Sequence, residues 1–212
     1  MQTLEQLQAI GNVENLDKHF LQIADIDATD TENWNNGQGF VPIGNSLFAF
    51  QGSYDGNNFC ITNLFILRPN TNDVGLFGYA FASFFNIELI DFNINGNSRV
   101  GGLLGTAVST FVINSKISGN IKGGAATGGL IGDSGNTTII DCYSNCDVEG
   151  GQFTGGLIGA LQGSIYNSIA NGLVIGNEDV GGLIGINLFG LIENSISNGN
   201  VSGNNSNIGG LV

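Results

Sequence analysis

Short apolar segments recur along the chain at a nearly constant spacing. Each contains a Gly-Leu core followed by a hydrophobic residue, and the core leucines step by 27, 27, 27, 26 and 28 residues. A steady period with one-residue slips indicates one structural unit per repeat, because slips are absorbed in turns rather than in packed strands. The core leucines are Leu76, Leu103, Leu130, Leu157, Leu183 and Leu211.

Each repeat contains three short apolar stretches separated by Gly or Asn, which indicates three strands. In one copy they are Leu130-Ile131, Thr138-Ile139-Ile140 and Asp147-Val148-Glu149. A unit of this size cannot bury its apolar face alone, so the units must stack as closed coils. The pattern therefore predicts an all-β, right-handed parallel β-solenoid of about 27-residue coils, the handedness following the usual preference of crossover connections.

Residues of one type recur at equivalent positions of successive repeats, as expected where coils stack about 4.8 Å apart. The Asn column predicts a ladder of side-chain amides that hydrogen-bond between coils. Glycines beside the core leucines are expected to form the corners, where the backbone needs conformations that other residues adopt at a cost. The columns are Asn114, Asp141, Asn167 and Asn194; Ser115, Cys142, Ser168 and Ser195; Gly119, Cys146, Gly172 and Gly199; and Ile121, Val148, Val174 and Val201.

The first seventy residues follow a different pattern. Thr3 and Gln6 are spaced as in a capping box, which predicts a short helix with Leu4, Leu7 and Ile10 on one face, ending at Gly11. Alternation over Phe20–Asp27 predicts a strand, residues 34–44 predict a polar loop, and residues 54–57 predict a tight turn. We therefore expect residues 1–70 to form an N-terminal cap with the first solenoid strands, and residues 71–212 to form the repeats.

The aromatic residues are concentrated at this end of the chain. Eleven of the fourteen phenylalanines precede residue 93, which predicts the bulkiest core in the cap and the first coil. A cap is expected there because the open edge of a solenoid otherwise presents unpaired strands.

Several segments together resemble the GLUG-motif proteins. The likeness covers nearly the whole chain, and it implies a large bacterial surface protein of the adhesin or filamentous haemagglutinin kind, or the non-catalytic region of an immunoglobulin A-cleaving metalloprotease. It implies location and architecture more than chemistry, and the zinc motif His-Glu-x-x-His of those proteases is absent. The segments are Leu4–Ile10, Leu21–Asp27, Trp34 with Val41–Gly44, Phe50–Asn57 and the repeated Gly-Leu-Ile-Gly.

Composition narrows the classes of partner. Eighteen acidic and five basic residues give a net charge of −13, which disfavours binding to nucleic acid and to anionic lipid. No apolar run approaches the roughly 20 residues that span a bilayer, so we expect no membrane insertion. The first residues lack the pattern of a signal peptide, so we expect any targeting segment of an exported parent protein to lie outside this chain.

Candidate chemistry is sparse, and we assign no catalytic, cofactor-binding or metal-binding residue. Four acidic residues, Asp25, Asp27, Asp30 and Glu32, crowd one loop, but they do not have the spacing of a calcium-binding loop. Four more, Asp133, Asp141, Asp147 and Glu149, share one repeat, as in carbohydrate-cleaving solenoids, but solvated faces account for them.

The remaining candidates are also interpreted as structural. His19 lies beside Lys18 and has no nucleophile suggested near it. Cys60, Cys142 and Cys146 are expected to pack in the fold, because two cysteines four residues apart on one strand are too distant for a disulfide. An ice-binding face would need a continuous threonine column, which is not formed by Thr106, Thr110, Thr127, Thr137, Thr138 and Thr154.

The sequence therefore predicts a non-catalytic structural or adhesive module, outside the cell or on its surface. The chain ends inside an opening strand at Gly210–Val212, so we expect possible self-association end to end through open solenoid edges. The alternative is a glycan-binding module, or one with another host or cell-surface ligand. A row of exposed aromatic side chains would indicate it, with Trp34 and Tyr54 as the candidates.

Overall fold

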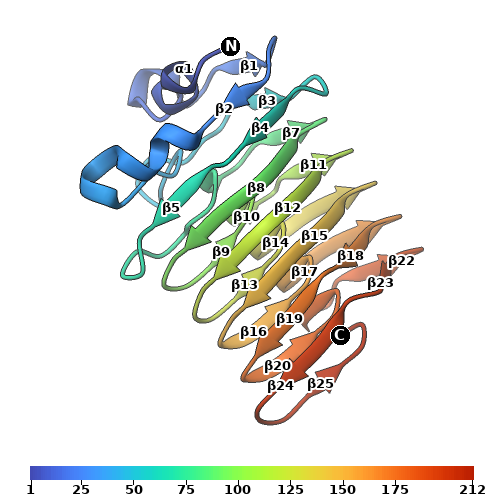
Figure 1. The fold of residues 1–212 in the computed structure, drawn as a ribbon. Coiled ribbons are helices and arrows are strands. Elements are labelled where there is room, and N and C mark those ends of the chain that lie inside the picture. Colours follow the sequence, from blue (N-terminus) through green and yellow to red (C-terminus); the bar gives the residue numbers. More distant parts are fainter.

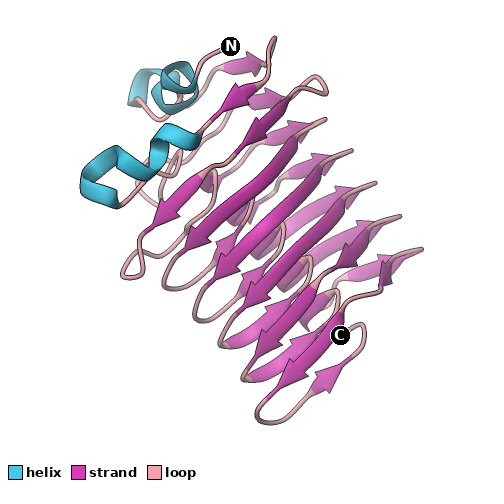
Figure 2. Cartoon of the chain, viewed as in Figure 1, coloured by secondary structure: helices cyan, strands magenta, loops and turns pink.

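The structure, a computed structural model, describes residues 1–212 and is a parallel β-solenoid of about six coils. The predicted all-β solenoid with coils of about 27 residues and a short N-terminal helix is confirmed. The coils stack along one axis from the helix-bearing N-terminal end to the C-terminal end (Figure 1). Each full coil contributes strands to three parallel sheets, called sheets A, B and C below, and Figure 2 shows the strands that stack from coil to coil. Two of the three stretches expected as separate strands, Leu130-Ile131 and Thr138–Ile140, meet in one strand of sheet A that runs over Ile131–Ile140, and the third sheet is formed by a short segment before the core leucine, such as Thr127–Gly128.

Sheets A and B have ten strands each, and sheet C has five. Sheet A contains β1 (His19–Leu21), β3 (Ser53–Asp55), β6 (Phe77–Ala80), β7 (Ser83–Phe85), β10 (Leu104–Val108), β11 (Phe111–Ile113), β14 (Ile131–Ile140), β17 (Ile158–Tyr166), β21 (Ile184–Asn187) and β22 (Leu191–Glu193). Sheet B contains β2 (Ile26–Asp27), β4 (Cys60–Thr62), β5 (Phe65–Leu67), β8 (Glu88–Asn95), β12 (Lys116–Lys122), β15 (Tyr143–Glu149), β18 (Ile169–Asn171), β19 (Leu173–Gly176), β23 (Ile196–Ser197) and β24 (Asn200–Gly203). Sheet C contains β9 (Val100–Gly101), β13 (Thr127–Gly128), β16 (Gln152–Gly155), β20 (Glu178–Gly181) and β25 (Ile208–Gly209).

The hydrophobic core runs through the middle of the coils. Side chains alternate between this core and the outside along each strand, since successive residues of a strand point to opposite faces. In sheet B, for example, Ile121 pairs with Val148 and Val148 with Val174, and all three side chains are buried. The predicted columns therefore exist, and the inward residues of neighbouring coils stack on one another.

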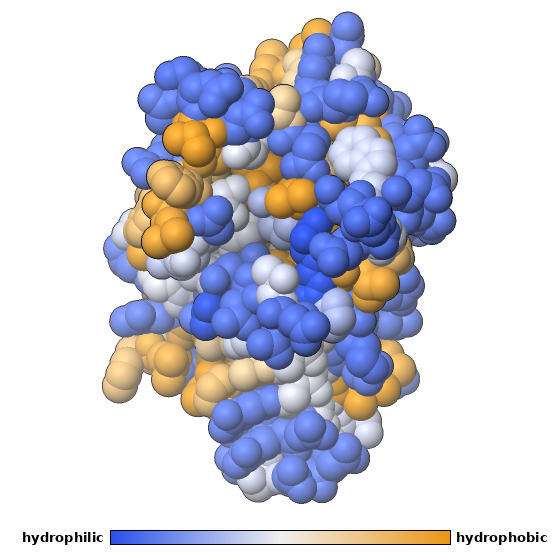
Figure 3. All heavy atoms as spheres, turned by 90° about the vertical axis from the view of Figure 1, so that its left-hand side faces the viewer, coloured by the Kyte–Doolittle hydropathy of each residue, from blue (hydrophilic) through white to orange (hydrophobic).

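The helix α1 (Leu4–Ala9) covers the N-terminal end, as predicted. The Thr3 hydroxyl accepts a hydrogen bond from the Gln6 backbone N–H, and Leu4 and Leu7 are buried. Two 3-10 segments follow, η1 (Val13–Asn15) and η2 (Thr29–Gly37). Figure 3 shows the side that carries the helical segments, where hydrophilic surface separates smaller hydrophobic patches.

Three expectations for the cap were wrong in detail. The strand expected at Phe20–Asp27 is broken into β1 and β2, because the buried amide of Gln22 donates to the carbonyls of Ala24 and Cys60 where the chain turns from sheet A to sheet B. Residues 34–37 of the expected loop at residues 34–44 belong to the end of η2, although Trp34, Asn35 and Asn36 have non-helical backbone dihedrals, as a loop would. The turn near residue 56 is a coil corner, since β3 and β4 belong to different sheets.

The assignment of corners to glycine was also wrong. Two corners per coil need a positive φ, but non-glycine residues occupy them. The glycines beside the core leucines do not have positive φ. Except at Gly210, which has open space around it, a side chain on them would overlap backbone of an adjacent loop or coil. One set of corners comprises Asn86, Asn114, Asp141, Asn167 and Asn194, and the other Asp73, Arg99, Ala126, Phe153, Asp179 and Asn207.

The expected concentration of aromatic packing near the N-terminal end is present. Phe50, Phe77 and Phe84 are fully buried, and their ring centroids lie 4.7 to 5.9 Å apart. Tyr54 packs edge-on against Phe77 and is also buried. Aromatic rings fill the wide first coils, whereas the later coils are filled mainly by Leu, Ile and Val.

Candidate functional site

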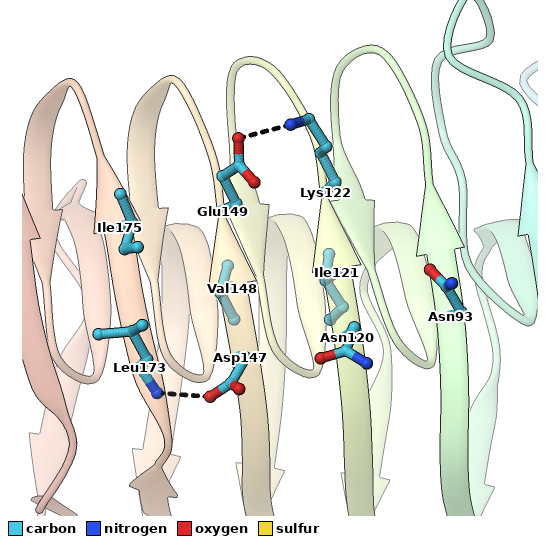
Figure 4. A pocket seen from close by; sticks show the side chains of 9 residues that line it. All are labelled: Asn93, Asn120, Ile121, Lys122, Asp147, Val148, Glu149, Leu173 and Ile175. Atoms are coloured by element: carbon cyan, nitrogen blue, oxygen red, sulfur yellow. Dashed lines mark hydrogen bonds and ion pairs between the residues drawn. The ribbon is translucent and has the colours of Figure 1, made fainter.

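The outer face of sheet B carries the clearest candidate site, a hollow of about 240 Å³ that crosses four coils (Figure 4). Its side chains come from β8, β12, β15 and β19, each of which presents alternate residues outward. The lining residues are Asn93, Asn120, Ile121, Lys122, Asp147, Val148, Glu149, Leu173 and Ile175.

The charges in this hollow are already engaged with neighbouring coils. Lys122 Nζ lies 2.5 Å from Glu149 Oε1, and Asp147 Oδ1 accepts a hydrogen bond of 2.9 Å from the Leu173 backbone N–H (Figure 4). Both members of the ion pair are more than half exposed, so the pair contributes little to stability. The polar groups form a surface of paired charges and amides rather than a desolvated pocket.

A second hollow of about 210 Å³ lies on the same face, toward the start of the same strands. Tyr143 lines it, and its hydroxyl accepts a hydrogen bond from Asn171 Nδ2 at 2.5 Å. The other lining residues are Glu88, Leu89, Ile90, Lys116, Ile117, Ser118 and Asn145.

The four carboxylates that share one repeat are not brought together. Asp147 and Glu149 are on the outer face of sheet B, Asp141 is at the next corner, and Asp133 is on β14 in sheet A. Asp147 and Glu149 are exposed to water and each has its own partner. The general acid of a glycosidase is a carboxyl held in an apolar site, whereas these two carboxylates are exposed.

Asp133 lies in a partly buried cluster of charges between sheets A and C. Burial raises its pKa, the nearby Arg99 opposes this rise, and Asp73 adds to it. Arg99 binds Asp73 through two nitrogens, at 2.6 and 3.0 Å, and the Thr106 hydroxyl donates to the same carboxylate at 2.6 Å. Asp73 is thus satisfied by two partners, Arg99 and Thr106.

Sequence reasoning missed both ion pairs, although a signal for each was present. Arg99 follows Asp73 by 26 residues in the sequence, and Glu149 follows Lys122 by 27 residues. Each separation is one coil, so pairing opposite charges one period apart would have found them.

The acidic loop near the N-terminus is used for local hydrogen bonds. Asp25 accepts from the Cys60 backbone N–H, and Asp27 accepts from Thr29 and from Asn63. These bonds, that of the Thr29 hydroxyl above all, lower the pKa of Asp27. No group of three or more His, Cys, Asp or Glu side chains in the chain is arranged to hold a metal ion.

The histidine and the cysteines have structural neighbours. His19 Nδ1 lies 2.9 Å from the Ser53 hydroxyl on the paired strand. Cys60, Cys142 and Cys146 are all free, and burial raises the pKa of the Cys142 and Cys146 thiols to about 12. The interpretation of these two cysteines as packing residues is confirmed, because a buried thiol of such pKa is a poor nucleophile.

The two aromatic candidates for glycan binding do not form an exposed row. Trp34 stacks on Phe40 and is half-buried, while Tyr54 is fully buried and donates its hydroxyl hydrogen to Gln22 Oε1. Tyr143, which no sequence pattern singles out, is the aromatic residue that lines the second hollow.

Comparison with known proteins identifies the repeat. The family model described as "The GLUG motif" matches residues 176–202, so the predicted resemblance to GLUG-motif proteins is confirmed by that motif. The chain is 38% identical over 107 residues to halomucin of Haloquadratum walsbyi, and 36% identical over 78 residues to a "Putative Gly-rich membrane protein" of Evansella cellulosilytica. These matches cover 47% and 37% of this chain but only 1% and 9% of the two relatives.

A solved structure shares the whole fold. The crystal structure of a "putative immunoglobulin A1 protease" from Bacteroides ovatus superimposes with a TM-score of 0.84 at 22% sequence identity. The match covers 100% of this chain and 70% of that chain. At this identity the likeness establishes the architecture and nothing about activity. None of the helices is long and apolar enough to cross a membrane.

Proposed function

Because the chain carries the GLUG motif on a parallel β-solenoid, we propose that it is a non-catalytic structural module of a cell-surface or secreted protein. It acts as a stalk, a spacer or an adhesive segment. The observation that carries this proposal is the unbroken stacking: parallel strand pairs link successive coils in sheets A and B from the cap to the last coil. Such a stack is stiff along its axis and presents long ladders of side chains.

The location outside the cell is supported by the names of the relatives. Halomucin and a Gly-rich membrane protein both indicate a cell-envelope or extracellular setting for similar repeats. The high amide and low charge content of the surface suits a module that is solvated without many ionic groups.

Single-molecule stretching tests the spacer role. Because each coil contacts only its neighbours, we expect stepwise unfolding, and a coil of 27 residues should release about 90 Å of chain at about 3.3 to 3.6 Å per residue. A compact globular domain would instead rupture in one step. One low-force, all-or-none rupture would contradict the proposal.

Glycan binding is the second candidate, and the hollow around Tyr143 favours it. An aromatic ring beside Ser118 and Asn145 offers both stacking and hydrogen bonding to a neutral sugar. Binding to a glycan array that is lost in Tyr143→Ala would support this function. The matched control is Tyr166→Ala, which removes a tyrosine from the outer face of sheet A. Equal loss in both variants, or no binding at all, would exclude it.

End-to-end assembly into fibres is also part of the proposal as a possible mode of the adhesive segment. Negative-stain electron microscopy over a range of concentrations tests it. Filaments with a regular axial repeat would support assembly, and separate particles at every concentration would contradict it.

A further inference from the structure

The outer face of sheet A differs from that of sheet B in its charge. Six stacked segments of six residues on this face contain two charged residues, Asp55 and Glu193; the segments are 50–55, 80–85, 108–113, 135–140, 161–166 and 188–193. The strands β8, β12 and β15 of sheet B contain six charged residues: Glu88, Asp91, Lys116, Lys122, Asp147 and Glu149. Since the chain has a net charge of −13, a second copy can approach the outer face of sheet A with less like-charge repulsion than it meets elsewhere.

This face is also apolar. Phe111 and Leu191 are 49% and 46% exposed, and the neighbouring outward side chains of Phe85, Ile113 and Tyr166 are half-buried. Beside them, Phe81 is 44% exposed at the bend of the sheet. Exposed apolar side chains that gather on one face mark an interaction surface, whereas scattered ones do not. The strands concerned lie together on one side of the solenoid (Figure 1).

The last residues of these strands point outward and form a column across the sheet. The order of residue classes along this column is the same from either end. The column has an acidic residue at each end, then an aromatic residue, and two isoleucines in the middle. A twofold axis that lies in the plane of a face-to-face contact, parallel to the strands and midway between the two isoleucines, therefore sets this column against the reversed column of a second copy. In register, the column is Asp55, Phe85, Ile113, Ile140, Tyr166 and Glu193.

We propose that two copies of this chain pack antiparallel through the outer faces of sheet A. In a twofold dimer the same patch serves on both sides, so Phe85 of one copy meets Tyr166 of the other, and Ile113 meets Ile140. The same arrangement sets Asp55 of one copy opposite Glu193 of the other at both edges of the contact. Glu193 is exposed and Asp55 is half-buried, so water and salt screen this like-charge pair.

The dimensions of this face give the area that the dimer would bury. Residues 135–140 extend about 20 Å along the strand, and five steps between coils extend about 24 Å across it. Each copy therefore contributes about 500 Å², or about 1,000 Å² in total, which is near the lower limit for a specific interface. We expect a weak dimer that forms at micromolar or higher protein concentration.

Sedimentation equilibrium over a concentration series tests the dimer. The average mass should rise from 22.0 kDa toward twice that value. Ile140→Glu should weaken the association by about tenfold or more, because it buries a carboxylate at the twofold axis. The matched control is Leu173→Glu, which places the same charge at a residue 39% exposed on sheet B and should leave the association unchanged. A monomer at all concentrations, or an equal effect of both variants, would overturn the proposal.

Disulfide trapping tests the antiparallel orientation. In one copy Phe85 and Tyr166 are three coil steps apart, about 14 Å, which is too far for a bond. In a Cys60→Ser background, Phe85→Cys and Tyr166→Cys chains should each stay uncrosslinked alone and crosslink when mixed. Circular dichroism checks that each variant is folded. Crosslinking of Phe85→Cys chains to each other, or no crosslink in the mixture, would overturn the antiparallel arrangement.

Discussion

At the scale of single residues, asparagine occupies many of the corners with positive φ, where glycine was expected, and glycine occupies positions where two backbones come close together. Asparagine can adopt a positive φ more readily than most residues, and its amide can also hydrogen-bond to the next coil. It therefore suits a corner better than glycine does. Glycine is needed where one coil passes so close to another loop that no Cβ fits, as at Gly132 against the backbone of Arg99 and Val100.

Two glycines of the same strand β14 test this assignment. Gly132→Ala should destabilise the fold by about 1–3 kcal/mol or more, because the added methyl group overlaps the Val100 backbone nitrogen. Gly135→Ala should be neutral or stabilise by up to about 1 kcal/mol, because the nearest atom is a Val108 side-chain carbon at 3.8 Å. Urea unfolding measures both. Equal effects would show that backbone conformation, and not space, selects glycine at position 132.

Asp141 interrupts the ladder of side-chain amides at the corners formed by Asn86, Asn114, Asn167 and Asn194. Asn114 donates to Asn86, and Asn167 donates to Asp141, but the carboxylate of Asp141 has no hydrogen to donate to Asn114. Asp141→Asn should add the missing bond to Asn114 and stabilise the fold by about 0.5–1.5 kcal/mol. The reverse change, Asn114→Asp, removes the bond to Asn86 and should destabilise by a similar amount. A destabilised Asp141→Asn variant would contradict the ladder as a source of stability.

At the scale of elements, the sequence predicts the features that recur in every coil, and it does not predict the features that occur in one coil alone. The columns of sheet B follow from spacing alone, because in-register stacking places equivalent residues on each other. The break between β1 and β2 has no periodic signal, since it depends on the Gln22 amide meeting Tyr54 and Cys60 from the next coil. The candidate site has the same division. Its alternation was predictable, whereas the bond of Asp147 to the Leu173 backbone N–H and the position of Asp133 near Arg99 and Asp73 occur once and have no periodic signal.

The corner between sheets A and C gives stability a pH dependence through Asp133. Burial raises the pKa of this carboxyl in the folded chain above its ordinary value of 3.8. The folded state then binds more protons than the unfolded state, so this group lowers stability as pH rises through the folded pKa. Asp133→Asn should therefore stabilise the fold at pH 7, and the gain should shrink below about pH 4. Urea unfolding at pH 3.5, 5 and 7 measures the difference, and a gain that grows on acidification would contradict the assignment.

At the scale of the whole molecule, the solenoid behaves as a stack of exchangeable coils. Nearly all strand pairs join one coil to the next, so stability is approximately a sum of coils and of contacts between neighbours. The bulky aromatic core and α1 close one end, and the coils after them repeat one pattern. Removing one whole coil should therefore leave the remaining packing intact.

Deletion of residues 130–156 tests this view of the fold. It joins Gly129 to Leu157 and places Ile121 over Val174, Asn114 over Asn167 and Ser115 over Ser168, so every column keeps its residue type. The variant should give the circular dichroism of a β-solenoid and a urea m-value lower by about one eighth, because 27 of 212 residues are absent. Deletion of residues 130–142 is the matched control. It removes about half a coil, places strands of different sheets against each other, and should leave the chain unfolded. If both deletions unfold the chain, the coils are not independent units, and the stack acts as one cooperative domain.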